Sequence, residues 1–377
     1  MQPHDQPGAA APLSGHLWVF VAFDWGEEVD LDQAGRLAGG AALELSRRPR
    51  TPSSFTYKPP PLRFPLGPLT LPLPGLEQVP ALSAEATVFD FAAVSVGVQV
   101  PFSLGAAELS ALAGRLADPA EADALVRAAR SALKPLYQRL LPAIQKPWWQ
   151  DAFWEEYFVF QFPPGPALPT EYLLAERAPW LAGLVRLEDA PLSAEEIAEA
   201  LRLYLRYGHH DLFVADWAAA VLVDREQECG ETLQAVEFAN LQLLQYRNID
   251  GRLDQDQARA QKMIHASLET RVPFWRSTEA PVRVVGELKV EASALFERTL
   301  NVLKLVGDQY LARLYRLLAT RFHLREWERS ISRKLEVIEG VYQVLSDQGV
   351  AFRTELLEII VVVLIVIEVL LAVFHHH

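Results

Sequence analysis

The chain has 377 residues, of which half are hydrophobic, and its formal net charge is −13 at pH 7. This length allows two domains with sizeable cores, and the hydrophobic fraction excludes an intrinsically disordered chain. The acidic balance argues against direct DNA binding, because binding to phosphate backbones needs concentrated Lys and Arg. Cys229 is the only cysteine, which excludes an intrachain disulfide and indicates a reducing compartment such as the cytoplasm.

Residues 1–15 contain one charged side chain, Asp5, and no basic stretch followed by an apolar core. This pattern is unlike a signal peptide or a mitochondrial transit peptide, so we expect a disordered leader. An α+β domain is predicted over residues 16–225. Its first strand corresponds to the apolar run 17–23, and the alternating, β-branched stretch 87–100 predicts one or two more strands.

A proline-rich insertion is predicted inside this domain at residues 52–80, which contain nine prolines. That density excludes a helix or a central strand, so the segment is either a packed loop or an extended ligand for an aromatic groove. Ser193 and Glu196 form a capping box that begins a helix expected to continue to Tyr207. The domain is expected to end with one buried strand at 211–223.

Residues 226–355 are predicted to form long helices. A helix is expected over 231–268, and apolar residues recur every three or four positions from 288 to 317. From Leu324 onward, two apolar rows repeat every seven residues, as in a coiled coil. We therefore predict an antiparallel hairpin of two long helices joined near His323.

Residues 356–374 are predicted to be a single C-terminal transmembrane helix. As a helix these residues would extend roughly 28 Å, close to the thickness of the hydrocarbon core. Arg333, Lys334 and Arg353 precede the segment and no Lys or Arg follows it, which favours a body in the cytoplasm. The expected location is therefore the bacterial cytoplasmic membrane, with the lipid bilayer as a partner. His375–His377 are native or a tag remnant and are assigned no role.

Glu368 is the main candidate site in this segment, because an ionisable group in hydrocarbon is costly and often functional. Either it is protonated and hydrogen-bonds a neighbouring chain in a homo-oligomer, or the apolar segment simply tolerates it. The candidate residues for membrane insertion and oligomerisation are Leu356, Glu358, Ile359, Val363 and Glu368.

Several blocks in the C-terminal half resemble one known family. The residues that carry the resemblance are Asn240, Arg247, Asp250, Phe274, Trp275, Asp308, Tyr310, Arg313 and Lys334, followed by the terminal segments 357–360 and 364–368. They are similar to blocks of the family named for "required for meiotic nuclear division". The resemblance implies a membrane-anchored, self-associating protein without an established catalytic activity. It also implies a possible ribosome partner, since mitochondrial relatives are associated with translation near the inner membrane.

Three other groups of polar or aromatic residues are candidate sites. His209, His210 and Asp211 suggest a metal site, but adjacent side chains on a strand point to opposite faces and a turn explains them equally well. The acidic residues Glu226, Glu228, Glu231 and Glu237 suggest a carboxylate site or, more simply, a solvated helix start. The aromatic pairs Trp148–Trp149 and Phe274–Trp275 suggest an interface, a core or a membrane surface. No metal or cofactor site is therefore predicted.

The favoured function is a tail-anchored, self-associating scaffold or tether that presents the α+β domain to a protein or ribonucleoprotein partner. No enzyme is expected, because the chain lacks the phosphate-binding, dinucleotide-binding, zinc-protease and hydrolase motifs. The alternative is an oligomeric ion channel with a magnesium-channel-like layout. That class has two spans joined by a Gly-Met-Asn loop, whereas this sequence predicts one span.

Overall fold

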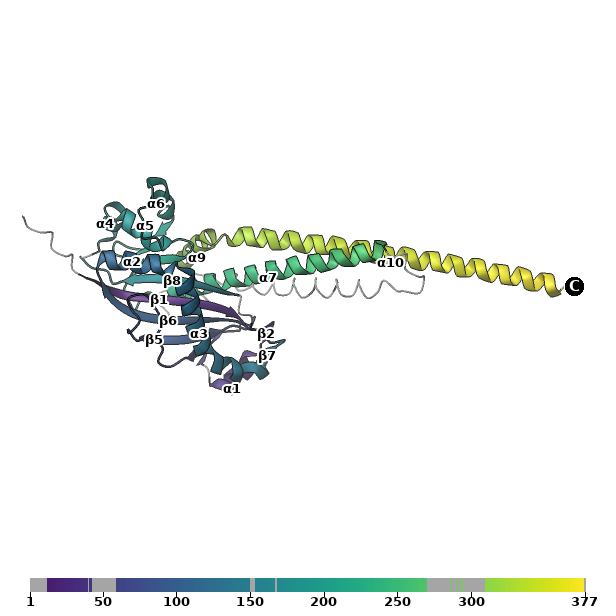
Figure 1. Ribbon diagram of the computed structural model, residues 1–377, viewed down its shortest axis with the longest axis horizontal. Helices are drawn as coiled ribbons and strands as arrows, with labels where there is room; N and C mark the ends of the chain where they lie inside the picture. The colour runs from purple at the N-terminus through teal and green to yellow at the C-terminus, as the bar shows by residue number, and fades with distance from the viewer. Residues whose placement is uncertain are drawn as a thin grey trace, which may run out of the picture. The chain divides into compact units, whose positions relative to one another are not determined.

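The computed structural model describes residues 12–39, 41–42, 59–149, 153–166, 168–269, 286, 290, 293 and 309–375 (Figure 1). The chain divides into two compact units. The first comprises Met1–Gln245 with Arg298–Arg325, and the second comprises Tyr246–Glu297 with Glu326–His377.

A large mixed sheet forms the centre of the first unit. Its strand order is β3-β4-β5-β6-β1-β8-β11-β10-β9, and all described neighbours are antiparallel except β8 and β11. The strands are β1 (Leu13–Asp24), β3 (Ala41–Ala42), β4 (Leu62–Pro65), β5 (Ser83–Val88), β6 (Ala93–Leu104), β8 (Trp154–Phe162), β9 (Tyr204–Leu205), β10 (Leu212–Ala215) and β11 (Ala219–Val223). A separate two-stranded ladder joins β2 (Glu28–Val29) to β7 (Ile144–Gln145).

One face of this sheet is covered by six helices of the described chain, of which α3 is the longest. They are α1 (Leu31–Ala38), α2 (Ala106–Leu116), α3 (Pro119–Leu140), α4 (Thr170–Ala175), α5 (Ala178–Arg186) and α6 (Ala194–Ala200), with a 3-10 turn η1 at Leu141–Ala143. Alternate residues of the long strands, such as Val19 and Phe160, pack with helix residues such as Leu133 and Leu184 in one hydrophobic cluster. Asp30 and Asp118 cap α1 and α3 by accepting backbone N–H groups.

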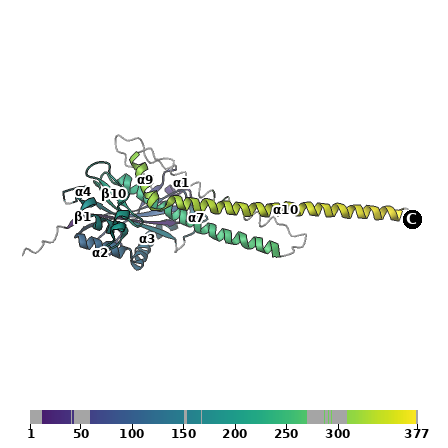
Figure 2. The same cartoon turned by 90° about the horizontal axis from the view of Figure 1, so that it is seen from above.

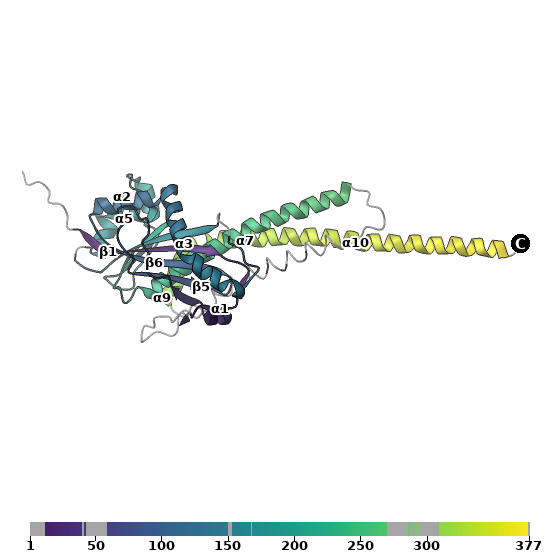
Figure 3. The ribbon, with the colours of Figure 1, turned by 60° about the horizontal axis from the view of Figure 1, so that its bottom comes forward.

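The opposite face of the sheet is covered by the first part of α7 (Gly230–Glu269) and by α9 (Gln309–Arg321). Figures 2 and 3 show α2 on one side of the sheet and α9 on the other. The ring of Tyr157 on β8 packs at 5.1 Å from the ring of Phe322, and Tyr315 on α9 hydrogen-bonds Gln242 on α7. The first unit is therefore a three-layer α+β domain, which confirms the predicted α+β character.

Local details of this domain differ from the sequence predictions. The predicted strand 211–223 is a hairpin, β10 and β11, that turns at Asp216–Trp217. The helix after Ser193 ends at Ala200, although the predicted cap is present, since Ser193 Oγ accepts the N–H of Glu196 at 3.2 Å. The described part of the proline-rich insertion forms β4 and a loop that buries its leucines Leu71, Leu73 and Leu76.

The second unit contains the later part of α7 and most of α10 (Leu324–His375). Asp250 on α7 contacts two residues of α10, accepting a hydrogen bond from Ser330 Oγ at 2.9 Å and pairing with Lys334 Nζ at 2.8 Å. Gln257 binds the carbonyl of Lys334, so these stretches of α7 and α10 run in the same direction.

The predicted antiparallel hairpin is only partly within the described residues. α9 ends at Arg321 and α10 begins at Leu324, with His323 at a positive φ of 51°, so the helices do break near His323. Most of the predicted helix at 288–317 lies outside the described residues. Among the described residues of the second unit, α10 pairs with α7, and this pairing is parallel.

The predicted transmembrane helix is wrong. In the described part of the chain, no helix is long and apolar enough to cross a bilayer. Residues 356–374 are the end of the continuous helix α10, and Glu358 and Glu368, both exposed, interrupt their apolar run with groups that are costly in hydrocarbon. The predicted tail anchor and membrane location are wrong with it, and the predicted bilayer partner and the ion-channel alternative lose their support.

Candidate functional site

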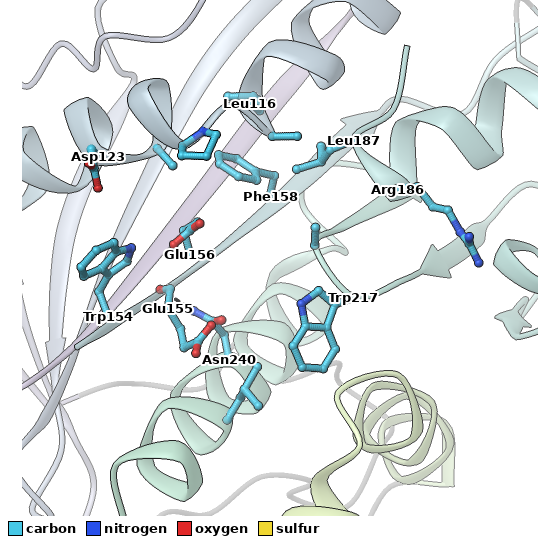
Figure 4. A pocket seen from close by; sticks show the side chains of 15 residues that line it. Leu116, Asp123, Trp154, Glu155, Glu156, Phe158, Arg186, Leu187, Trp217 and Asn240 are labelled. Carbon is cyan, nitrogen blue, oxygen red and sulfur yellow. Dashed lines mark hydrogen bonds between the residues drawn. The ribbon is translucent and has the colours of Figure 1, made fainter. Parts of the chain in front are cut away.

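A cavity of about 370 Å³ lies in the first unit, at the beginning of β8 (Figure 4). Pockets of this size are typical of sites for small molecules or single side chains. Its lining comes from the α2–α3 junction, from β8, from the end of α5, from the β10–β11 turn and from α7. The lining residues are Leu116, Ala117, Pro119, Ala122, Asp123, Trp154, Glu155, Glu156, Phe158, Arg186, Leu187, Trp217, Ala218, Asn240 and Leu243.

The alternation of strand β8 decides which of its side chains share a face. Successive strand residues point to opposite faces, so Trp154, Glu156 and Phe158 lie on one face and Glu155 on the other. Phe158 belongs to the cluster beneath α1–α6. On the α7 side, the amide of Asn240 donates to the backbone oxygen of Glu155 at 3.2 Å, which fixes the beginning of β8 against α7.

The electrostatics of the cavity are acidic. Burial raises the pKa of Glu156, and the neighbouring carboxylate of Asp123 raises it further, whereas hydrogen bonds from the backbone and from Trp154 lower it. Arg186 is the cationic side chain of the lining, but Asp216 and Glu196 bind its guanidinium. Its positive charge is therefore balanced by carboxylates that do not line the cavity.

Trp217 gives the cavity an exposed aromatic side chain. It occupies the β10–β11 turn, where its backbone N–H donates a hydrogen bond to the Asp216 carboxylate at 2.8 Å. The residue is 46% exposed, although its ring lies 6.3 Å from that of Phe322 and 6.1 Å from that of His323. Because exposed aromatics at a concave surface often contribute to recognition, Trp217 is a candidate contact residue.

A buried ion network holds the turn that carries Trp217. The hydroxyl of Tyr157 donates to the backbone oxygen of Asp216 at 2.9 Å. The Arg186 Nε donates to the Asp216 carboxylate at 2.9 Å, and the Arg321 Nη1 lies 3.7 Å from its other oxygen. Three elements, β8, α5 and α9, thus position one turn.

A second cavity, of about 190 Å³, lies over Gly97 on the face of the sheet that packs against α7. Its main titratable group is Glu237, which is buried and faces the hydroxyl groups of Thr87 and Ser95. Burial raises the pKa of Glu237, while the charge of Arg63 lowers it. This cavity is smaller and its polar groups contact one another, so it is the weaker candidate.

The residues that carried the family resemblance are spread over both units. Asn240 lines the first cavity, and Tyr310 on α9 packs its ring against that of Tyr207 at 5.8 Å. Arg247 and Arg313 are exposed. The structure brings Asp250 and Lys334 together in the second unit, as described above. The resemblance residues that lie outside the described part of the chain are Phe274, Trp275 and Asp308.

The predicted oligomer residues lie near the end of α10. Val363 is exposed, as are Glu358 and Glu368, and the side chains of Leu356 and Ile359 lie outside the described residues. The described residues contain no group of three His, Cys, Asp or Glu side chains that could hold a metal ion.

The other clusters have structural explanations. Asp211 accepts the N–H groups of Tyr207 and Gly208, so the segment with His209 and His210 is a turn. Trp149 packs in the core against Phe23, Trp25 and Tyr137. The acidic cluster at the start of α7 does not converge, since Glu226 binds Gln99 while Glu237 is buried elsewhere. Burial raises the pKa of Cys229 to about 12, as expected for an unreactive thiol.

Comparison with known proteins identifies the family of the first unit. Residues 14–229 match the family described as "Uncharacterized protein MJ0711, N-terminal domain". The chain belongs to this family. A relative, the uncharacterized protein MJ0711 of the archaeon Methanocaldococcus jannaschii, is 26% identical over 231 residues, which cover 59% of this chain and 67% of the relative. No solved structure matches the chain.

The MJ0711 N-terminal domain contains the cavity residues from Leu116 to Ala218 but not Asn240 or Leu243. Because the relative is archaeal, the predicted bacterial origin is not supported. Sequence reasoning missed Trp154, Glu156 and Trp217 as site residues. The one local signal was a tryptophan beside an aspartate, Asp216–Trp217, inside an otherwise apolar run.

Proposed function

We propose that this protein is a non-enzymatic recognition protein, whose MJ0711 N-terminal domain binds a partner molecule at the cavity beside β8. The observation that carries this proposal is the combination of a partly open cavity of about 370 Å³ with the exposed Trp217 at its lining. Binding sites are commonly concave and mostly apolar, with a few polar groups that give orientation. This cavity has that composition.

The chemistry of the lining supports binding. Its residues include no Ser, Thr, Cys, His or Lys, and its titratable acids are Asp123, Glu155 and Glu156. Glu155 and Glu156 are adjacent on a strand and point to opposite faces, so the carboxylate that influences Glu156 is Asp123. The partner class remains the one expected from the sequence, a protein or a ribonucleoprotein.

Self-association through α10 is a second element of the proposal. Six apolar side chains near the end of the helix are exposed: Val361, Val362, Val363, Leu364, Ile365 and Ile367. Val363 lies on one of the two heptad rows, whereas Glu358 and Glu368 lie on neither. A second copy of α10 would cover part of this apolar surface.

Site-specific crosslinking tests recognition at the cavity. A photoreactive amino acid replaces Ala122, which lines the cavity on α3, and a matched control replaces Leu82, which is 61% exposed and lies outside it. We expect one adduct of discrete mass from position 122 in cells, and we expect the additional substitution Trp217→Ala to reduce it several-fold. Equal adducts from both positions, or none from position 122, would contradict the proposal.

A further inference from the structure

The side chains around the cavity indicate the charge of its ligand. Asp123, Glu155 and Glu156 line it, and the guanidinium of Arg186 is bound by Asp216 and Glu196. In Figure 4, Arg186 lies apart from the carboxylates. An anionic ligand would therefore meet like charges, whereas a cation would gain attraction in a partly desolvated site. The net charge of −13 adds a long-range attraction for basic ligands.

Two indole rings line the cavity together with these carboxylates. Trp154 stands on one side of Glu155 and Glu156 in Figure 4, and Trp217 stands on the other. The Trp154 side chain hydrogen-bonds the carboxyl group of Glu156, and its half-buried ring packs against the core and lines the cavity. Indole rings attract cations through their quadrupole, with about 0.5–2 kcal/mol per contact. Carboxylates and indoles together are typical of a site for an organic cation.

A metal ion does not fit these side chains. Metal ions need three or more ligand atoms that converge on one point, and the described residues contain no such group. Glu155 and Glu156 point to opposite faces of β8, while Asp123 comes from α3. A cation whose charge is spread over several atoms, and whose apolar stem can contact Leu116, Phe158 and Leu187, suits this lining better.

We propose that the cavity between Trp154 and Trp217 binds a cationic nitrogen group, an ammonium or guanidinium, carried on an apolar stem. This inference rests on the proposed function and specifies its ligand class. The group is supplied by a lysine or arginine side chain of the partner or by a free alkylamine. Glu156 provides the main countercharge, and the two indoles contact the cation and its stem.

The binding test uses the full-length protein labelled with 5-fluorotryptophan, observed by ¹⁹F NMR. The chain has nine tryptophans, so the resonances of Trp154 and Trp217 are assigned from Trp→Phe variants. One arm titrates butylamine and butylguanidine, and the other titrates acetyl-Gly-Arg-Gly-amide with its citrulline counterpart as an uncharged match. We expect both assigned resonances to shift with the cationic probes and not with the citrulline peptide.

Variants identify the countercharge. Glu156→Gln is nearly isosteric and should weaken binding of the cationic probe at least about five-fold, equivalent to about 1 kcal/mol. Glu77→Gln removes the same charge from an exposed side chain outside the cavity and should leave affinity unchanged. The inference is overturned if the citrulline peptide binds equally well, or if the two variants have equal affinity. Tighter binding of the peptide than of the free amines would identify a protein side chain as the source.

The outcomes separate this inference from the proposed function. If position 122 yields its adduct but no cationic probe binds, recognition at the cavity stands and the ligand class is wrong. If the probes bind but no adduct forms in cells, the cation site stands and recognition of a macromolecular partner fails.

Discussion

Replacing Arg321 with methionine should destabilise the first unit, because this arginine joins α9 to α6 and to the turn that carries Trp217. Its side chain is only 6% exposed. Nη2 donates to the backbone oxygens of Glu199 and Ala200 at 2.7 and 2.9 Å, and Nη1 lies 3.3 Å from the Glu199 carboxylate. Methionine preserves much of the apolar stem but supplies none of these donors.

The expected loss of stability follows from the hydrogen-bond acceptors that Arg321→Met leaves without a donor. Each carbonyl that loses its donor costs about 1–3 kcal/mol when it is buried. The ion pairs add little to this loss, because Glu199 is 48% exposed and keeps its contact with Arg202, and Asp216 keeps its contact with Arg186. With two carbonyls left without their donor, we expect a loss of about 2–4 kcal/mol for Arg321→Met.

The matched control is Arg202→Met. Arg202 also pairs with Glu199, at 2.8 Å, but its side chain is 58% exposed. Exposed pairs contribute about 0–1 kcal/mol, so this variant should differ little from the parent protein. Urea denaturation followed by circular dichroism measures both. A loss below about 1 kcal/mol for Arg321→Met, or equal losses for the two variants, would refute the argument that the buried position of Arg321 makes its hydrogen bonds important for stability.

Two further predictions concern a buried acid and the proposed self-association. Folding raises the pKa of Glu237 above 4.5, so its stabilising contribution is present below pH 4.5 and is lost as pH rises through its folded-state pKa. Glu237→Gln should therefore increase the stability measured by thermal unfolding at pH 7, because the glutamine carries no charge to bury. The stability of this variant should also depend less on pH than that of the parent protein. Lower stability of the variant at pH 7 would contradict this. Val363→Asp should lower the oligomer mass in light scattering, whereas Glu368→Gln should not; unchanged mass for both variants would reject the α10 interface.

Short-range patterns predicted several elements correctly. The apolar run at 17–23 is the centre of β1, and the alternating stretch 87–100 contains the turn between β5 and β6. The Ser193 capping box begins a helix because the hydroxyl and the N–H that it binds are only three residues apart. Such features depend on neighbours in the chain, so the sequence is sufficient to recognise them.

Patterns of hydrophobicity failed where burial has several possible causes. The run 211–223 is apolar whether it forms one strand or two, and the hairpin at Asp216–Trp217 is favoured by contacts from Tyr157 and Arg321. The apolar segment 356–374 satisfied a hydropathy criterion for a membrane span, but the structure makes it the end of a continuous helix. Hydropathy indicates that a segment avoids water and not which surface covers it.

The amino-acid sequence by itself determined the α+β character, the main strands and the long helices, because periodicity and capping act over a few residues. The candidate site was decided only by the tertiary structure. Its lining extends from Leu116 to Leu243, and the parallel pairing of β8 with β11 joins segments that lie far apart in the chain. The local signal at Asp216–Trp217 does not place Trp217 near Trp154, since the cavity exists only once both helical layers pack on the sheet.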